Sequence, residues 1–325
     1  MSTQTIAKRR EYLFLYDVSF ANPNGDPNDE NKPRIDEETG KNIVTDVRLK
    51  RTIRDYLKDY EGLEIFVREI EEDDGSIQDA KARARDFLKN TENLEDKSLK
   101  EQKQILADNI LKQCIDVRLF GATIPIDLTI KDKDKKKNVT SSITYTGPVQ
   151  FEMGQSLHRV KLEYIKGTGA FASEKGKEQK TFREEWVLPY SLIAFHGVAN
   201  ENAAKDTGLT DEDLEYLKKG IWYGTKNLIT RSKAGQIPRL LIEIVYRDGV
   251  HSHIGELHRF IKLETEKADE EIRSPEDYVL NVDKLLEAIE EEKEKIEKVL
   301  FRKDKNLKLN KDLVIEGIEF VEMEI

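Results

Sequence analysis

Few side chains in this sequence could carry acid–base or metal chemistry. The densest group consists of His251 and His253, followed by Glu256 and His258. The His-x-His spacing places two imidazoles on one side of a strand, but a zinc site normally needs third and fourth ligands at a recognisable distance. Histidines in a loop after a strand are common, so we predict no metal site and no cofactor.

Four aspartates near the N-terminus, Asp26, Asp29, Asp36 and Asp46, are carboxylates of the kind that a two-metal nuclease uses. Asp26 lies inside a Gly/Pro turn, where an Asx turn or a hydrogen bond to a backbone N–H is the ordinary role. His196 follows an apolar strand and is predicted to be a hydrogen-bonded core residue. The sequence has no P-loop and no nucleophile beside a plausible base. We therefore predict no catalytic residues.

The cationic side chains that could bind a phosphate backbone are concentrated in three stretches. The first is a helix after Thr45, where Lys50, Arg51 and Arg54 lie off the apolar face. Residues 158–183 carry seven lysines and arginines against three acidic residues, and residues 218–239 carry six with no acidic residue between them. Guanidinium and ammonium groups neutralise phosphates. A merely solvated basic face is the alternative at each stretch.

The formal net charge of -10 is unevenly distributed along the 325 residues. From Glu264 to the end there are 20 Asp and Glu against 11 Lys and Arg, a net of -9, which leaves -1 for residues 1–263. A nucleic-acid partner is therefore compatible with the first part of the chain. We expect the segment after Glu264 to be repelled by RNA and to face solvent or a basic partner.

The elements that position these residues begin with a nearly continuous apolar run, Tyr12 to Val18, which predicts a strand buried on both faces. Asn22 to Pro27 follows as a tight turn-rich loop. Thr45 or Asp46 is the predicted N-cap of a helix. Its apolar face is predicted to consist of Leu49, Ile53, Tyr56, Leu57 and Tyr60.

Further along, a charged insertion with a helix near 79–88 precedes a second helix that starts at a Ser98–Glu101 capping box. Strand patterns flank a charged tip at 131–138 and recur at 161–166, 180–186, 186–199 and 239–247, and a helix starts at Thr210. The C-terminal part is predicted as a helix over 282–300 and a strand over 313–321. The apolar pattern around Cys114 predicts a core position.

This order predicts an α+β fold with a modified RRM-like, or ferredoxin-like, βαββαβ core. The core carries a large insertion after the first helix, a protruding β-hairpin between the middle strands and a helical C-terminal extension. The predicted divisions are 1–60, 61–146, 147–247 with the hairpin at about 161–185, and 248–325. No RNP1-type word is present, so RNA recognition by aromatics on the sheet is not expected.

Four words, LFLYDV, NPNGDP, PRIDEETG and VTDVRLKRTIRDYL, resemble the N-terminus of the CRISPR-associated protein seven family. This is the repeated backbone subunit of type I CRISPR Cascade complexes, within the RAMP superfamily, and the words look most like subtype I-B. The resemblance implies a non-catalytic protein that polymerises along crRNA and displays it for pairing with target DNA. Its implied partners are copies of itself and other Cascade subunits, in the cytoplasm of a prokaryote, with no membrane association.

Two alternatives stay open at this point. One is a metal- or His-dependent ribonuclease of the RAMP superfamily, because type III backbone subunits cut RNA with a loop aspartate; Asp26 and His158 are the residues to test. The other is a scaffold without RNA contact.

The predicted RNA-binding residues combine the loop, the basic helix, the hairpin and the third basic stretch. Phe171 is the only bulky apolar residue near the hairpin tip and is predicted to wedge between bases, with packing on the hairpin or on a neighbouring subunit as the alternative. The full set is Asn22, Asn24, Gly25, Arg34, Thr45, Lys50, Arg51, Arg54, Arg159, Lys161, Phe171, Lys180, Arg183, Lys226, Arg231 and Lys233.

Overall fold

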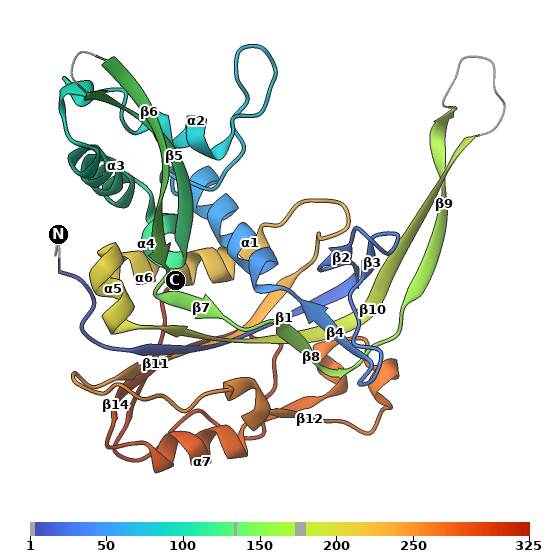
Figure 1. The fold of residues 1–325 in the computed structure, drawn as a ribbon. Coiled ribbons are helices and arrows are strands. Elements are labelled where there is room, and N and C mark those ends of the chain that lie inside the picture. The colour runs from blue at the N-terminus through green and yellow to red at the C-terminus, as the bar shows by residue number, and fades with distance from the viewer. Residues whose placement is uncertain (1–3, 133–134, 173–179) are drawn as a thin grey trace. The chain divides into compact units, whose positions relative to one another are not determined.

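The computed structural model describes residues 4–132, 135–172 and 180–325, and their side chains except those of 130–136 and 168–183. The chain forms two compact units (Figure 1). The first comprises Met1–Lys8, Arg54–Gln150 and Ala199–Lys218, and the second comprises Arg9–Ile53, Phe151–Val198 and Lys219–Ile325. Helices and strands are both abundant, which confirms the α+β class.

A nine-stranded sheet, counted over the described residues, organises the second unit. Its strands follow the order β15-β14-β11-β1-β10-β8-β4, and β7 and β9 also pair with β10. The strands are β1 (Arg10–Ala21), β4 (Lys41–Val44), β7 (Val149–Phe151), β8 (Gly154–Arg159), β9 (Glu163–Ala172), β10 (Lys180–Ala199), β11 (Ile237–Tyr246), β14 (Ile296–Lys303) and β15 (Glu319–Glu322).

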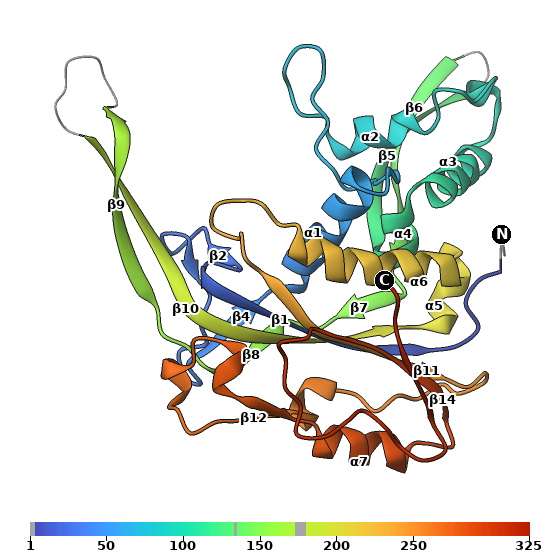
Figure 2. The same ribbon diagram turned by 180° about the vertical axis from the view of Figure 1, so that it is seen from behind.

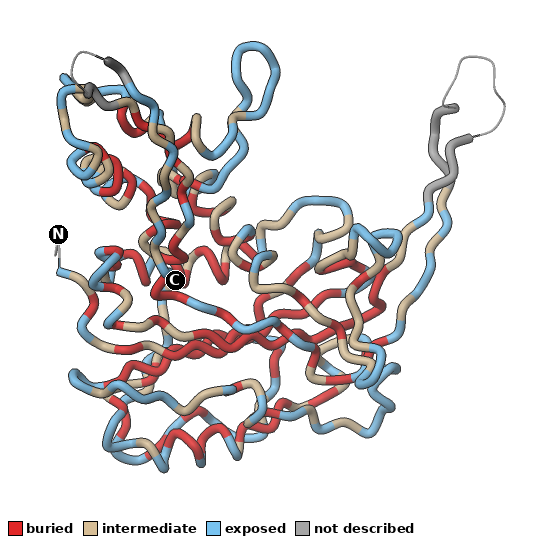
Figure 3. The backbone as a smooth tube through the Cα atoms, in the orientation of Figure 1, coloured by how far each residue is buried: buried red, intermediate tan, exposed pale blue. Residues whose placement is uncertain are grey.

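Strand β1 is buried on both faces, as its continuous apolar run predicts. Leu13 and Leu15 belong to a core that also contains residues of β10, β11 and the C-terminal segment. On the opposite face the ring of Tyr16 stacks with those of Phe14 and Phe195, at centroid distances of 5.6 and 6.2 Å. Figure 3 shows this run of buried residues along the centre of the sheet. Burying each such side chain contributes about 1.5–3 kcal/mol.

The predicted helix over 282–300 is wrong in its second half. Helix α7 (Asp283–Glu291) is followed by strand β14, which pairs antiparallel with β11. Glu/Lys pairs at i,i+4 stabilise a helix by only about 0.2–0.5 kcal/mol each. A row of backbone hydrogen bonds to a buried strand, with Ile296 and Val299 in the core, outweighs them.

The rest of the C-terminal segment is also less helical than predicted. The predicted strand over 313–321 overlaps β15 only at its end, and β15 runs parallel to β14. The remaining elements are the strands β12 (Lys262–Glu264) and β13 (Val279–Asn281) and the 3₁₀ turns η3 (Leu257–Phe260), η4 (Asp269–Glu271) and η5 (Pro275–Asp277). Ser274 caps η5 in a capping box with Pro275 as the next residue.

The first unit has a hydrophobic core of its own, which joins Phe66, Phe87, Leu106 and Cys114 with the inner side chains of strand β5 (Gly121–Asp132). The helix near 79–88, the capping box at Ser98 and the buried position of Cys114 are confirmed. The elements are α2 (Ala80–Asp86), η1 (Leu94–Asp96), α3 (Leu99–Gln113), α4 (Ile115–Phe120), β5 (Gly121–Asp132), β6 (Lys135–Thr146), α5 (Glu201–Thr207) and α6 (Asp211–Lys219). The π-helical turn η2 (Gly220–Gly224) follows α6 in the second unit. None of the helices in the described part of the chain is long and apolar enough to cross a membrane.

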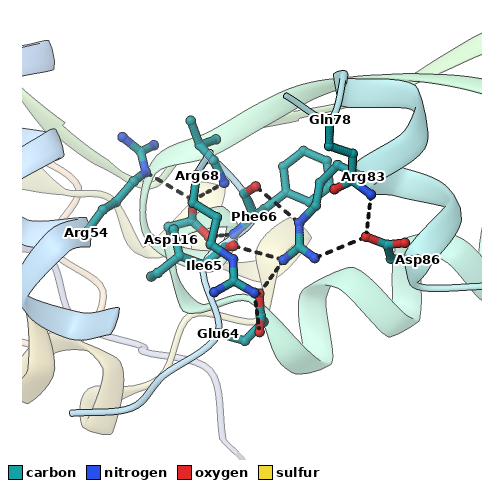
Figure 4. Close-up of polar contacts among 10 residues, drawn as sticks. Arg54, Glu64, Ile65, Phe66, Arg68, Gln78, Arg83, Asp86 and Asp116 are labelled. Carbon is teal, nitrogen blue, oxygen red and sulfur yellow. Dashed lines mark hydrogen bonds and ion pairs between the residues drawn. The ribbon is translucent and has the colours of Figure 1, made fainter. Parts of the chain in front are cut away.

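Two buried charged groups fix the insertion in the first unit (Figure 4). The Asp116 carboxylate accepts hydrogen bonds from the backbone N–H groups of Phe66 and Val67, at 2.8 and 3.1 Å. Arg83 pairs with Glu64 and lies over the Phe87 ring, 4.5 Å from its centroid. Residues 61–97 are rich in charge and resemble solvated surface in the sequence. The contacts of Asp116 and Arg83 nevertheless fix residues 64–67 of this segment in place.

The arms of the predicted hairpin lie in β9 and in the first part of β10, which pair antiparallel from Lys180↔Ala172 to Val187↔Glu163. Figures 1 and 2 show the two strands leaving the sheet together. Strand β10 is one continuous strand of 20 residues, so the arm and the buried strand that the sequence separates at Trp186 are a single element.

His196 is a hydrogen-bonded core residue, as predicted. Its Nε2 lies 2.9 Å from Glu11 Oε1 and its Nδ1 lies 3.2 Å from Glu152 Oε1. Burial disfavours the charged imidazole, but the hydrogen bonds and charges of the two carboxylates outweigh it and raise the pKa of His196. For Glu11, burial is likewise outweighed by hydrogen bonds from His196, Tyr246 and Gly255, which lower its pKa.

We expect the contribution of this pair to stability to depend on pH. The raised pKa of His196 stabilises the fold below the ordinary value of 6.5 and ceases to do so as pH rises through the folded value. The lowered pKa of Glu11 stabilises the fold above the ordinary value of 4.5, and this stabilisation is lost as pH falls through the folded value. The loss of unfolding free energy in His196→Gln is therefore greatest between these two values and shrinks in alkali. Urea denaturation across the pH range, with His251→Gln as the control, measures it. A difference independent of pH would contradict a charged pair.

Candidate nucleic-acid interface

Two loops meet at the end of β1 in the second unit. We call residues 22–36 the Asn loop and residues 225–236 the basic loop. Because β1 and β11 are antiparallel, with Asp17 opposite Ile237, the end of one strand lies beside the start of the other. The backbone N–H of Asn22 donates to Ser232 O at 2.8 Å, and the Lys233 ammonium donates to Asn22 O at 3.2 Å. The contact joins the Asn loop to the third predicted basic stretch.

The Asn loop is a miniature hairpin, as its turn-forming residues suggest. Its two-residue strands β2 (Gly25–Asp26) and β3 (Lys32–Pro33) pair antiparallel. The Asp26 carboxylate accepts from the Asn28 N–H at 3.0 Å and from Arg34 at 2.7 Å. The predicted backbone bond of Asp26 is confirmed. Both carboxylate oxygens thus hold the loop together.

We expect Gly25→Ala to distort the Asn loop. A Cβ at Gly25 would lie 2.0 Å from the side-chain oxygen of Asn31 and 2.7 Å from its backbone oxygen. That backbone oxygen also accepts from the Asn22 side chain at 2.6 Å, so the displacement passes to the contact with the basic loop. Overpacking of this kind costs about 1–3 kcal/mol. Thermal melting measures the cost. Gly167→Ala, in β9, is the control for glycine replacement, because a Cβ there meets no atom within 4 Å and the backbone does not have a positive φ. A Gly25→Ala melting curve identical to wild type would rule out the clash.

The N-terminus of helix α1 (Asp46–Asp59) is tied to the Asn loop. Asn24 Oδ1 accepts from Thr45 N at 2.8 Å and from Thr45 Oγ1 at 2.9 Å, and Thr45 Oγ1 accepts from Arg48 N at 3.3 Å. Thr45 is therefore the N-cap, as predicted. These bonds fix the first turn of α1 against the Asn loop.

Lys233 and Arg48 form a pair of like charges beside these loops. Burial lowers the pKa of Lys233, and the positive charge of Arg48 lowers it further. The ammonium donates to Asn22 O and Ser232 Oγ, which are both uncharged oxygens. Phosphates at this place would bring negative charge to the buried Lys233 ammonium.

The basic face predicted on α1 does not hold as a whole. Lys50 is mostly buried and pairs with Asp46 at 3.0 Å, whereas Arg51 is exposed. Arg54 pairs with the buried Asp116 at 3.0 Å in the first unit and lies over the Phe120 ring. Tyr60, assigned to the apolar face, is exposed. Arg54 therefore has a structural role that accounts for its charge.

The third basic stretch is likewise divided. Lys218 is buried and pairs with Glu215, and Arg239 is buried between Asp17 and Asp304. The cations of the basic loop itself are Lys226, which is exposed, Arg231, which pairs with Glu185 of β10 at 2.9 Å, and Lys233. The predicted RNA-binding part of the third basic stretch is therefore limited to the basic loop.

At the base of the hairpin, Lys161 is exposed and Arg159 is 3.8 Å from Glu270. The side chains of Phe171, Lys180 and Arg183 lie outside the described residues, so their predicted roles stay predictions.

His158 offers no free base. Its Nε2 accepts from Leu192 N at 3.3 Å, and its Nδ1 faces the backbone oxygens of Arg159 and Asp269. Burial lowers the pKa of His158, which keeps the ring neutral. Over the described part of the chain, no three His, Cys, Asp or Glu residues converge in a way that could hold a metal ion.

Two features of this site were not predicted from the sequence. Arg48 lies three residues after Thr45, on the same side of the helix, and this spacing could have indicated it. The second feature is an aromatic patch beside the Asn loop, where the Lys32 ammonium is 5.4 Å from the centroid of Trp186 and the Tyr164 ring is 5.0 Å from that of Trp186. Only the pairing of β9 with β10 brings these rings together.

Comparisons with known proteins identify a family for the sequence and similar folds among solved structures. The family model described as CRISPR-associated protein Cas7 matches residues 8–283. A CRISPR-associated protein Cas7 from Haloferax volcanii is 34% identical over 325 residues, which cover 97% of this chain and 93% of the relative. A chain of a solved "CRISPR RNA-guided surveillance complex, pre-nicking" is 11% identical, with a TM-score of 0.54 over 97% of this chain and 96% of that chain. A chain of another "CRISPR RNA-guided surveillance complex" has a TM-score of 0.49 at 11% identity, over 98% and 95%.

Proposed function

The chain belongs to the CRISPR-associated protein Cas7 family, and from this premise we propose that it is a non-catalytic subunit that binds crRNA. In this proposal, copies of the protein polymerise along the guide as the backbone of a type I Cascade surveillance complex. The guide is then displayed for pairing with target DNA, while the protein contacts its backbone. Other Cascade subunits complete the assembly in the prokaryotic cytoplasm. The subtype I-B assignment stays a prediction.

The observation that carries this proposal is the pair Lys233 and Arg48 between the Asn loop and the basic loop. The lowered pKa of Lys233 means that its charge is poorly compensated within the protein. Successive phosphodiesters of an RNA strand each carry one negative charge and can neutralise Lys233 and Arg48 without needing a particular base. Of the predicted RNA-binding residues, Asn22, Asn24, Gly25 and Thr45 build this place, and Arg34, Arg51, Lys226 and Arg231 extend from it.

The fold provides a framework for this role. We assign β11, β1, β10 and β8, adjacent in that order, to a ferredoxin-like core in which α1 and α6 are the connecting helices. The insertion over 61–146, which has its own hydrophobic core, is then a separate lobe. The β9–β10 hairpin, with Lys161 and Arg159 at its base, is the element assigned to contact the next copy. A heterologous contact of this kind repeats without closing and produces a helical stack.

A salt titration tests RNA binding directly. We expect the affinity for a short single-stranded RNA to fall linearly with salt on a log–log plot, with a slope of about 0.7 for each phosphate contacted. Protein purified from its host should carry guide-length RNA, and electron microscopy should show regular filaments on it. A protein that neither retains RNA nor binds it at low salt would be a scaffold without RNA contact.

The ribonuclease alternative has its own test. Labelled guide RNA is incubated with the protein and Mg²⁺ or Mn²⁺. We expect no cleavage, because Asp26 is engaged by Arg34 and by a backbone N–H, and both nitrogens of His158 are engaged. Specific cuts that disappear in Asp26→Ala or His158→Ala would overturn the non-catalytic assignment.

A further inference from the structure

Phe20 combines a strained backbone with an exposed aromatic ring. Its φ is 47°, in the left-handed region that bulky residues rarely adopt, and the residue is 57% exposed. Val18 and Ala21 are buried, so the turn at Phe20 breaks the alternation of β1 and leaves Ser19 and Phe20 both facing solvent. The backbone strain opposes folding, and the exposed ring gains little burial energy to offset it. Outliers of this kind are concentrated at functional sites.

The backbone on either side of Phe20 is held firmly. Ser19 Oγ donates to Pro189 O of β10 at 3.4 Å. Two residues after Phe20, the backbone N–H of Asn22 donates to Ser232 O of the basic loop. The backbone of Phe20 is therefore held beside the basic loop, two residues from the Asn22 carbonyl that accepts from Lys233. The basic loop adds a second exposed apolar side chain, Ile229, which is 86% exposed.

We propose that Phe20 is a base-stacking residue, whose ring packs on an unpaired base of the RNA strand that Lys233 and Arg48 hold by its phosphates. This inference rests on the proposed function. Aromatic rings stack on any base, which suits a subunit that must accept every guide sequence. A protein partner fits less well, because it would need carboxylates placed opposite these two cations, whereas every RNA strand brings phosphates.

The test compares two probes, an oligouridine and an abasic oligoribonucleotide of the same length, which carries the same phosphates but no bases. Affinities are measured by fluorescence anisotropy with protein held below the concentration at which it assembles. We expect Phe20→Ala to weaken oligouridine binding roughly 5- to 100-fold and to leave binding of the abasic probe unchanged. Phe20→Trp should retain the affinity of the wild type.

Two further variants separate binding from folding. Phe20→Gly should bind oligouridine as weakly as Phe20→Ala does, yet melt at a higher temperature, because glycine adopts a positive φ without a steric penalty. Val314→Ala is the control, since Val314 is an exposed apolar residue, 67% exposed, between the core residues Leu313 and Ile315 of the C-terminal segment. Its affinities should equal those of the wild type.

The outcomes are distinguishable. If the wild type binds both probes and Phe20→Ala weakens neither, or weakens both equally, base stacking is refuted and the proposed RNA-binding function stands. If Phe20→Ala changes only assembly, Phe20 contacts a protein and the inference fails. If the wild type binds neither probe at low salt, the proposed function fails and the inference with it.

Discussion

Arg54→Ala is expected to lower the free energy of unfolding by about 3 kcal/mol, the effect of leaving a buried charge without its partner. Asp116 has no exposed surface, and its Oδ2 lies 3.0 Å from Arg54 Nε. Two backbone N–H groups still donate to the carboxylate, but both are uncharged donors. Chemical denaturation measures the loss, and RNA affinity per folded molecule should be unchanged.

Two comparisons make this result specific. Arg51→Ala, an exposed arginine on the same helix, should change stability by less than about 0.5 kcal/mol. Adding Asp116→Asn to Arg54→Ala should recover part of the stability, because the amide removes the unpaired charge. If Arg54→Ala melts like the wild type and instead weakens RNA binding, Arg54 belongs to the interface as its sequence position first suggested.

The double variant Arg48→Ala/Lys233→Ala should lose roughly 100-fold in affinity for single-stranded RNA, at about 1.5 kcal/mol for each charged contact. The salt dependence should become shallower by about 1.4, or 0.7 for each phosphate contact removed. The loss should be the same for unrelated sequences, because phosphate contacts carry no sequence information. Anisotropy titrations at several salt concentrations measure both quantities.

Stability should move differently from affinity in these variants. Burial and the charge of Arg48 lower the pKa of Lys233, so its positive charge opposes folding. Lys233→Met should therefore melt no lower than the wild type while it binds RNA more weakly. Lys284→Ala, at an exposed position of α7, controls for the loss of one positive charge. An unchanged salt slope in the double variant would exclude phosphate contacts by Arg48 and Lys233.

Phe20 and Lys233 share one property. Each has a feature that disfavours the folded protein: a left-handed backbone for Phe20 and an uncompensated charge for Lys233. Phe20 lies two residues before Asn22, and Lys233 donates a hydrogen bond to the Asn22 carbonyl from the basic loop. Local features that weaken a fold persist where a ligand needs them. Their proximity is the reason for assigning the interface to this end of the sheet.

The sequence by itself determined the elements whose signals are local. The apolar run Tyr12 to Val18 predicted β1, Thr45 predicted the start of α1, and Ser98 with Glu101 predicted the start of α3. Each signal lies within a few residues, because side-chain periodicity and capping bonds act over one turn or one strand. The same local reading identified Asp26 as a turn residue.

Only the tertiary structure decided which charged side chains have a structural role and which can bind RNA. Arg54 looks solvated until Asp116, 62 residues away, is placed beside it, and Lys233 meets Asn22 across 211 residues. Strand β14 replaced a predicted helix because β11 offered it a row of backbone hydrogen bonds. The energy of an ion pair or a strand pairing depends on distance in space, whereas a local sequence pattern reports only distance along the chain.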